Sequence, residues 1–323
     1  MPVPKSPPGP HCRKGDGRAM PLNRPSLFGL LLAAGASCTA NPAPVPTGGT
    51  QAPVQSKQTD AVPLRQHSPQ ARMQFWLARP AAQGVVMIAR APEGAVSVTF
   101  NGASLPLTSD GFFLLGFDRD AENSASLAAT FADGRSIEQY VPVAPGTWDI
   151  QHVAANPLGG ARTSAEFQAR RGAELAQINA ARARRIESDG WRQDFIWPVE
   201  GRISGKFGSQ RVYNGTPGSY HSGLDIARPA GTPFVAPADG VVTLAAATPF
   251  TLEGHLLMID HGMGLSSAFL HCSELLVEVG DLVRQGQVIG KIGATGRASG
   301  PHLHWGMKWN AARVDPLLLL SQP

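Results

Sequence analysis

The chain has 323 residues and a formal net charge of +4, with 42% hydrophobic and 16% charged residues. This length allows two compact domains plus tails, and the basic residues form no dense run of the kind that indicates nucleic-acid binding. The 36 glycines and 28 prolines favour many turns, so we expect mainly β structure rather than a helical bundle.

Residues 1–38 have the features of an export signal region. From Met20 onward, Arg24 precedes a short apolar run over residues 27–34, and small residues then lead to Cys38. The run is too short to cross a membrane as a helix, and this order is typical of a secretory signal whose true start is Met20.

Cys38 leaves two routes of processing open. Residues 35–38 (Gly-Ala-Ser-Cys) resemble a bacterial lipoprotein cleavage box, in which the cysteine is acylated and becomes the new N-terminus. Ordinary signal cleavage after Ala36 is the alternative. Residues 39–71 contain almost no large apolar side chain, which predicts a disordered tether and favours the lipoprotein.

Residues 72–150 are predicted to form a small β-sandwich-like domain. Short β-prone runs occupy residues 73–77, 85–88, 96–100 and 111–115, with turn signals at 101–102, 109–111 and 133–134. His67 and His152 lie alone in sequence, so we expect a positioning module without catalytic groups.

A linker helix is predicted within residues 160–192. Residues 163–166 (Thr-Ser-Ala-Glu) form a capping box, and Asp189-Gly190 would end the helix. Phe167 and Ile178 belong to only a narrow apolar stripe, which favours a solvated linker. Seven arginines against four acids between residues 162 and 192 leave a second interpretation open, contact with anionic wall polymer or a partner.

Six of the nine histidines fall in the last segment, residues 197–318. His302 and His304 are two apart in an expected strand, so both imidazoles should point to one face. His221 and Asp225 are four apart across a flexible Ser-Gly-Leu segment. Two imidazoles and one carboxylate are typical ligands of a catalytic zinc with one position open for water. The surplus histidines, with His271 as a further candidate, suit proton transfer and oxyanion stabilisation in amide hydrolysis.

Five segments of this region resemble the lysostaphin/LytM-type metalloendopeptidases, family 23 of the metallopeptidases, which have the duplicated hybrid motif. They are residues 221–226 (HSGLDI), 236–242 (APADGVV), 259–262 (IDHG), 279–290 (VGDLVRQGQVIG) and 296–305 (GRASGPHLHW). The resemblance covers about residues 197–316 and implies an antiparallel β fold with a groove. The expected fold class is therefore mainly β: a small N-terminal β-sandwich, a linker helix and a C-terminal antiparallel β peptidase domain.

The resemblance also implies a function. The expected activity is zinc-dependent hydrolysis of peptide bonds in peptidoglycan, at stem-peptide cross-links rather than glycine bridges, by an exported protein of the periplasm or cell envelope. A lipidated Cys38 would attach it to a membrane, and no nucleic acid is involved. The alternatives are an inactive domain of the same fold that binds wall or activates an amidase, and a zinc carrier.

The resemblance assigns roles to individual residues. It makes His221, Asp225 and His304 the Zn2+ ligands, and His302 and His271 the catalytic histidines. His255 and His261 fall where the family pattern needs no histidine and are expected to be structural, and Cys272 is expected to be a small buried apolar residue.

Overall fold

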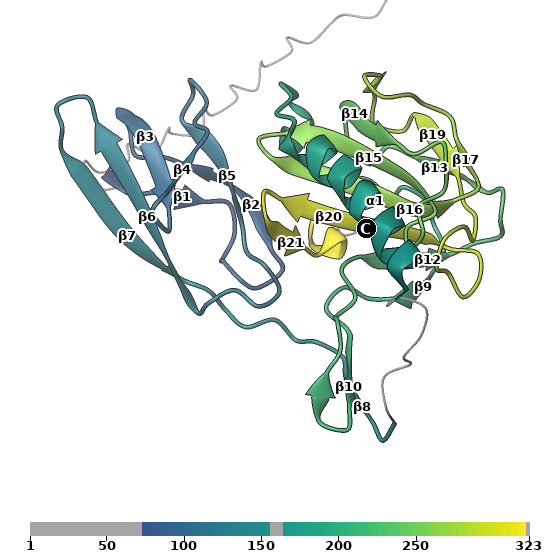
Figure 1. Ribbon diagram of the computed structural model, residues 1–323. Helices are drawn as coiled ribbons and strands as arrows, with labels where there is room; N and C mark the ends of the chain where they lie inside the picture. The colour runs from purple at the N-terminus through teal and green to yellow at the C-terminus, as the bar shows by residue number, and fades with distance from the viewer. Residues whose placement is uncertain (1–72, 156–163, 321–323) are drawn as a thin grey trace, which may run out of the picture. The chain divides into compact units, whose positions relative to one another are not determined.

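β-strands dominate this computed structural model, which describes residues 73–155 and 164–320. The predicted export signal, Cys38, His67 and the predicted tether lie outside these residues. Among the described residues, no helix is long and apolar enough to span a membrane. The mainly β fold predicted from turn-rich composition is confirmed (Figure 1).

The front part of the described chain is a sandwich of two antiparallel sheets. One sheet has the order β1-β2-β5 and the other β4-β3-β6-β7. Their bounds are β1 (Trp76–Leu77), β2 (Val86–Arg90), β3 (Ala95–Phe100), β4 (Ala103–Leu105), β5 (Phe112–Gly116), β6 (Ser124–Phe131) and β7 (Ser136–Pro142). Phe113, Leu115 and Leu127 are completely buried between the sheets. Asn101 and Gly102 both have positive φ, as a tight hairpin between β3 and β4 requires.

A short strand then pairs with the second half of the chain. β8 (Ile150–Val153) runs parallel to β10 (Gln210–Tyr213), which also pairs with β11 (Thr216–Pro217). This pairing fixes the segment that precedes His221.

The second half contains an eight-stranded sheet in the order β18-β14-β15-β16-β20-β12-β9, with β21 paired to β20. Its strands are β9 (Arg202–Gly205), β12 (Leu224–Ala227), β14 (Gly240–Ala245), β15 (His255–Gly262), β16 (Leu265–Cys272), β18 (Leu282–Val283), β20 (Leu303–Trp309) and β21 (Ala312–Val314). A three-stranded sheet joins β13 (Pro233–Val235), β19 (Val288–Lys291) and β17 (Glu274–Leu275). Phe234, Phe269 and Trp305 are fully buried in the shared core.

Helix α1 (Ala165–Ala183) is capped by Ser164, the second residue of the predicted capping box and not the first, because the Ser164 hydroxyl accepts a hydrogen bond from the Phe167 amide at 3.1 Å. Its end at Ala183 comes before the predicted stop at residues 189–190, where a short 3-10 turn, η3 (Gly190–Arg192), lies instead. A second such turn, η4 (Pro316–Leu318), is close to the end of the described chain.

The helix was expected to be a solvated linker, and most of it is exposed, but one side packs on the large sheet. Ile178 and Ala181 are buried against Leu256 and Met258 of β15. Glu174 is also buried, and its carboxylate accepts hydrogen bonds from the Thr251 amide and hydroxyl, both at 2.6 Å. A narrow apolar stripe is sufficient here because a buried polar contact completes the helix–sheet interface.

The sandwich and the large sheet share part of one hydrophobic cluster. Val86 and Leu114 of the sandwich belong to the same cluster as Trp309 of β20. The Phe100 and Trp309 rings meet edge to face, with centroids 5.8 Å apart. The predicted division into separate domains at residues 72–150 and 197–318 stays a prediction, but side chains from both segments pack together.

Candidate metal centre

Two of the predicted site residues lie side by side on neighbouring strands. β12 and β20 are antiparallel, and their register places Asp225 opposite His304. Directly opposed side chains on one face of a sheet are close enough to interact. His304 Nδ1 is 2.8 Å from Asp225 Oδ1.

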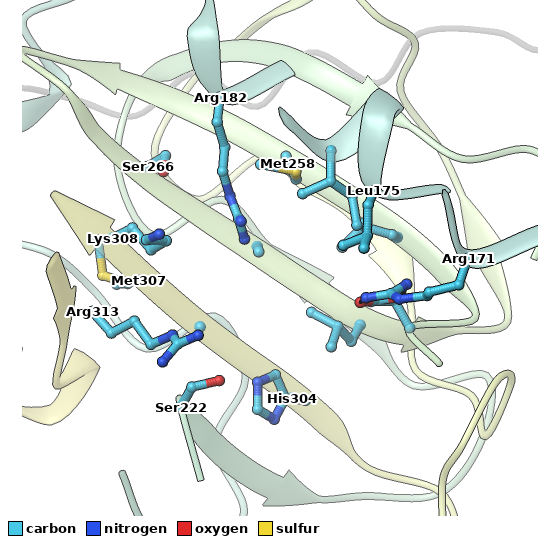
Figure 2. Close-up of a pocket in the computed structure, with 16 residues that line it drawn as sticks. Arg171, Leu175, Arg182, Ser222, Met258, Ser266, His304, Met307, Lys308 and Arg313 are labelled. Atoms are coloured by element: carbon cyan, nitrogen blue, oxygen red, sulfur yellow. Dashed lines mark hydrogen bonds and ion pairs between the residues drawn. The ribbon is translucent and has the colours of Figure 1, made fainter. Parts of the chain in front are cut away.

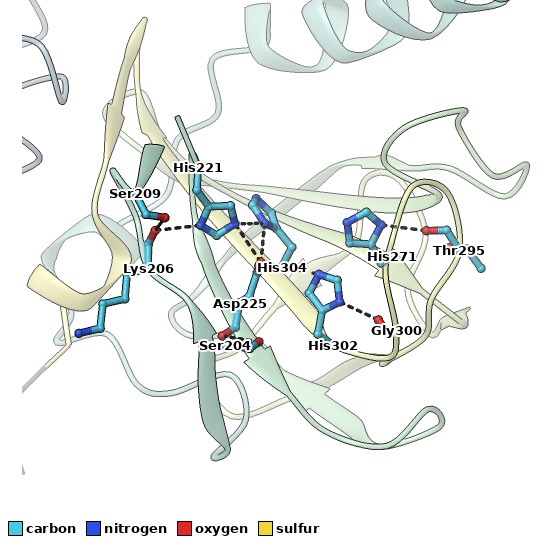
Figure 3. A network of polar contacts seen from close by, with 10 residues as sticks. All are labelled: Ser204, Lys206, Ser209, His221, Asp225, His271, Thr295, Gly300, His302 and His304. Carbon is cyan, nitrogen blue, oxygen red and sulfur yellow. Dashed lines mark hydrogen bonds and ion pairs between the residues drawn. The ribbon is translucent and has the colours of Figure 1, made fainter. Parts of the chain in front are cut away.

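His221 joins this pair from the loop before β12. Its Nε2 atom lies 3.0 Å from Asp225 Oδ1 and 3.1 Å from His304 Nδ1. The Ser209 carbonyl accepts the backbone N–H of His221, and the Gly208 N–H donates to its carbonyl, both at 2.8 Å. The structure thus brings the predicted ligand atoms of three residues into one small triangle (Figure 3).

Two glycines leave room for these side chains. A Cβ on Gly205 of β9 would lie 2.5 Å from Asp225 Oδ2. A Cβ on Gly223 would lie 2.7 Å from His304 Nε2 and 2.6 Å from the Trp305 carbonyl oxygen. All three distances are shorter than real carbon contacts, so a larger residue at either position would displace a side chain of the centre.

The hydrogen bond of His221 to a carbonyl oxygen gives its ring a tautomer that suits a cation in the centre. Its Nδ1 is 3.0 Å from the Lys206 carbonyl oxygen, which can only accept, so Nδ1 carries the proton. A neutral His221 would then direct the Nε2 lone pair at the Asp225 carboxylate oxygen, which is also an acceptor. Favourable contact therefore requires a proton or a metal ion between them. The three atoms are separated by 2.8–3.1 Å, close to the roughly 3.3 Å edge of a tetrahedral zinc site.

The titration of the three groups follows the same electrostatics. Burial raises the pKa of Asp225, but hydrogen bonds from His221 and His304 outweigh it and hold the pKa well below its usual range. Burial lowers the pKa of His221, but the Asp225 carboxylate outweighs it and raises the net value. Burial dominates at His304, whose pKa is lowered. The centre therefore combines a firmly ionised carboxylate with an imidazole that favours its neutral, metal-binding form.

His302 lies on the same side of β20 as His304, as strand alternation predicts. It comes just before the strand, in an isolated bridge with Gly293. Its Nε2 is 3.7 Å from Asp225 Oδ1, which is beyond hydrogen-bond distance, and its Nδ1 is 2.8 Å from the Gly300 carbonyl oxygen. That carbonyl fixes the proton on Nδ1 and leaves Nε2 facing the centre.

His271 reaches the same space from the end of β16. Its ring centroid lies 4.9 Å from that of His302 and 6.3 Å from that of His304. The Thr295 carbonyl oxygen is 2.8 Å from His271 Nδ1, so the other ring nitrogen faces the centre (Figure 3). Burial lowers the pKa of His271. Its φ of +64° is rare for a side chain of this size and is held by the surrounding contacts.

The remaining histidines lie elsewhere. His261 is completely buried and hydrogen-bonded on both ring nitrogens, and His255 directs Nδ1 to the Ala246 carbonyl oxygen at 2.9 Å. His152 is exposed on β8. Cys272 is fully buried in the core, and burial raises its pKa to about 12, in agreement with its expected apolar role.

The sequence did not predict one contact that supports the segment before His221, and this contact comes from the sandwich. Arg119 is buried; its Nε donates to the Gly208 carbonyl at 3.1 Å, and its guanidinium lies 4.8 Å from the Tyr220 ring centroid. Gly208 contacts the backbone of His221, and Tyr220 precedes it in the chain. No local signal could have revealed this contact, because Arg119 is about one hundred residues away in sequence.

A cavity adjoins the centre. It has a volume of about 250 Å³ and is lined by residues of α1 and of the large sheet, together with Ser222 and His304 (Figure 2). His304 therefore borders both the ligand triangle and an open space large enough for part of a substrate.

Comparison with known proteins gives a consistent result. Residues 219–316 match Peptidase family M23. A solved structure from Pseudomonas aeruginosa, described as a peptidase M23, is 30% identical, covers 75% of this chain and 96% of its own, and has a TM-score of 0.58.

Curated relatives match a part of the chain. Peptidoglycan DD-endopeptidase ShyA of Vibrio cholerae is 40% identical over 135 residues, which is 39% of this chain and 31% of the relative. DD-carboxypeptidase/endopeptidase Mpg of Neisseria meningitidis is 41% identical over 97 residues, which is 30% of this chain and 22% of the relative. The chain thus spans less than a third of the length of these two relatives.

Proposed function

The chain belongs to peptidase family M23, and from this membership we propose that it is a zinc-dependent endopeptidase that hydrolyses peptide bonds in bacterial peptidoglycan. The observation that carries the proposal is the convergence of His221, Asp225 and His304, with His302 and His271 directed at the same space. Relatives named peptidoglycan DD-endopeptidase and DD-carboxypeptidase/endopeptidase support stem-peptide cross-links over glycine bridges.

His221, Asp225 and His304 would hold the zinc ion. Two imidazoles and one carboxylate suit zinc and leave a coordination position open. The Lys206 carbonyl keeps the proton of His221 on Nδ1, so that Nε2 is available as a ligand. When bound, zinc supplies the Lewis acid for amide hydrolysis.

His302 and His271 would handle protons and negative charge. Carbonyl oxygens of Gly300 and Thr295 hold the ring protons on Nδ1, so each neutral ring presents Nε2 as a base. A ring that accepts a proton from the attacking water becomes a donor, which can stabilise the oxyanion or protonate the leaving amine. Both histidines therefore act in the transition state and not in metal binding.

The proposal is tested with purified full-length protein, isolated wall sacculi and a chelator. Zinc-loaded protein should release peptide fragments that mass spectrometry assigns to cleaved cross-links, and chelation should stop the release. Zinc binding without any fragments would favour the alternatives, an amidase-activating domain or a zinc carrier. Fragments cut within glycine bridges would refute the proposed bond.

We also propose that the protein is exported to the cell envelope and attached to a membrane through a lipidated Cys38. The support is the sequence pattern of residues 20–38 and the wall substrate proposed above. Mass spectrometry of the mature N-terminus tests it, since an acylated Cys38 and an unmodified Ser37 have different masses. A Cys38→Ser variant should lose membrane partitioning.

A further inference from the structure

The cavity beside His304 has two walls of different origin. α1 forms one wall, and β20 with β21 forms the other, while residues of β15 and β16 lie between them. Figure 2 shows the Arg182 side chain extending from α1 into this space, with Lys308 and Arg313 entering from the side of the sheet. Ser222 and His304 border it, so the cavity adjoins one of the proposed ligand residues of the metal centre.

The charges that line the cavity are unbalanced. Arg171, Arg182, Lys308 and Arg313 line it, and Glu253 is the only acidic residue among the described lining residues. Arg171 forms a bidentate ion pair with the Glu253 carboxylate, with Nη1 and Nη2 at 2.6 and 2.7 Å from its two oxygens. No carboxylate of the described lining remains for the other three cations.

These three cations are short of partners. Within the described parts of the chain, the side chains of Arg182 and Lys308 have no hydrogen-bond or ion-pair partner. Arg313 donates from Nη1 to the Tyr220 hydroxyl at 3.3 Å. Asp118, an acid outside the lining, accepts the Arg313 backbone N–H at 2.8 Å and the Tyr220 hydroxyl at 3.2 Å.

The cations also act on one another. Burial lowers the pKa of Lys308, and the positive charges of Arg182 and Arg313 lower it further. Like charges held around one cavity cost free energy that a bound anion would remove. A peptide lying along this cavity toward His304 carries such anions as carboxylates, and guanidinium groups match carboxylate geometry well.

We propose that Arg182, Lys308 and Arg313 form a subsite for a free carboxylate of the peptide substrate. The proposal rests on the proposed peptidase function, and it makes α1 one wall of the substrate site. It assigns specificity to this subsite: stem peptides with free carboxylates bind in preference to those whose carboxylates are amidated.

Binding to metal-free full-length protein tests the subsite without turnover. The probes are a cross-linked stem peptide with free carboxylates and the same peptide with all carboxylates amidated, measured by calorimetry at low salt. Wild type should bind the acidic form about 10-fold more tightly, as one charge-assisted hydrogen bond allows. Arg182→Gln and Lys308→Gln should each reduce this preference. Arg170→Gln is the matched control, since Arg170 is exposed on the same helix and does not line the cavity.

The outcomes separate the two proposals. Equal binding of both peptides by wild type overturns the subsite, and so does an unchanged preference in both cavity variants. Loss of preference in Arg170→Gln overturns it as well, because a general charge effect would then explain the result. Cleavage of the same peptides by the zinc-loaded protein tests the peptidase independently. If neither peptide is cut, the peptidase proposal fails while the binding data still decide the subsite.

Discussion

Acid should destabilise this fold through His261. This side chain is completely buried and belongs to a hydrogen-bond network with Asp239, Ser267 and Trp305. The Asp239 carbonyl oxygen lies 2.8 Å from Nδ1 and can only accept, so Nδ1 carries the ring proton. Nε2 then accepts from the Ser267 hydroxyl at 2.8 Å, and that hydroxyl oxygen accepts from Trp305 Nε1 at 3.1 Å. When the His261 ring is neutral, both of its nitrogens have a hydrogen-bond partner in this network.

The size of the effect follows from the displaced pKa. Burial lowers the pKa of His261 from 6.5 to about 4. Between these values the unfolded chain binds a proton that the folded chain does not, so stability is complete above pH 6.5 and is lost as the pH falls toward 4. Integrating this difference from pH 7 to about pH 4.5 gives a loss of about 2 kcal/mol.

The measurement compares wild type with His261→Gln, which cannot titrate at this position. Urea unfolding of both proteins, with chelator present, gives the free energy of unfolding at pH 7 and pH 4.5. Wild type should lose about 2 kcal/mol more than the variant over this interval. His221, His304 and the other titrating groups are present in both proteins, so their contributions to the pH dependence cancel in the comparison. An equal loss in the two proteins would refute the assignment of a neutral buried ring.

Four further variants test the metal centre and its support. Asp225→Ala should bind no stoichiometric zinc, whereas His302→Ala should keep its zinc and lose wall hydrolysis by roughly 100-fold or more, as measured by metal analysis and fragment release. Gly205→Ala should weaken zinc binding by about 10-fold in competition titrations, because its Cβ would press on the Asp225 carboxylate. Arg119→Ala should lower the free energy of unfolding by about 2 kcal/mol, since it leaves the Gly208 carbonyl without its donor. Unchanged zinc affinity in Gly205→Ala, or unchanged stability in Arg119→Ala, would contradict these contacts.

The sequence could predict part of the convergence of these side chains, because the spacing within each pair is local. His302 and His304 are two residues apart at the start of a strand, so strand geometry alone puts them on one side. His221 and Asp225 are four apart around Gly223, where a Cβ would clash with His304. Their separation from the second pair is long, and only the β12–β20 register brings the pairs together.

The sequence was less informative about α1. Its apolar stripe is narrow, and part of its interface is polar: buried Glu174 bonds to Thr251, and Arg171 pairs with Glu253. Hydrophobic periodicity does not report such contacts, because charged residues on a helix are usually solvated. The helix was therefore expected to be a linker, although it packs on the sheet.

These contacts change the role of the residues that precede the family-like segment. Arg119 of the sandwich bonds to the Gly208 backbone, which in turn contacts His221, and Arg182 of α1 enters the cavity that His304 borders. The three proposed metal ligands all lie within the segment that matches the family, residues 219–316. The proposed chemistry and two of the subsite cations, Lys308 and Arg313, therefore lie in the shared segment, while Arg119 and Arg182 contribute from outside it. Relatives that share the metal centre but differ in the preceding segments would keep the reaction and change the substrate.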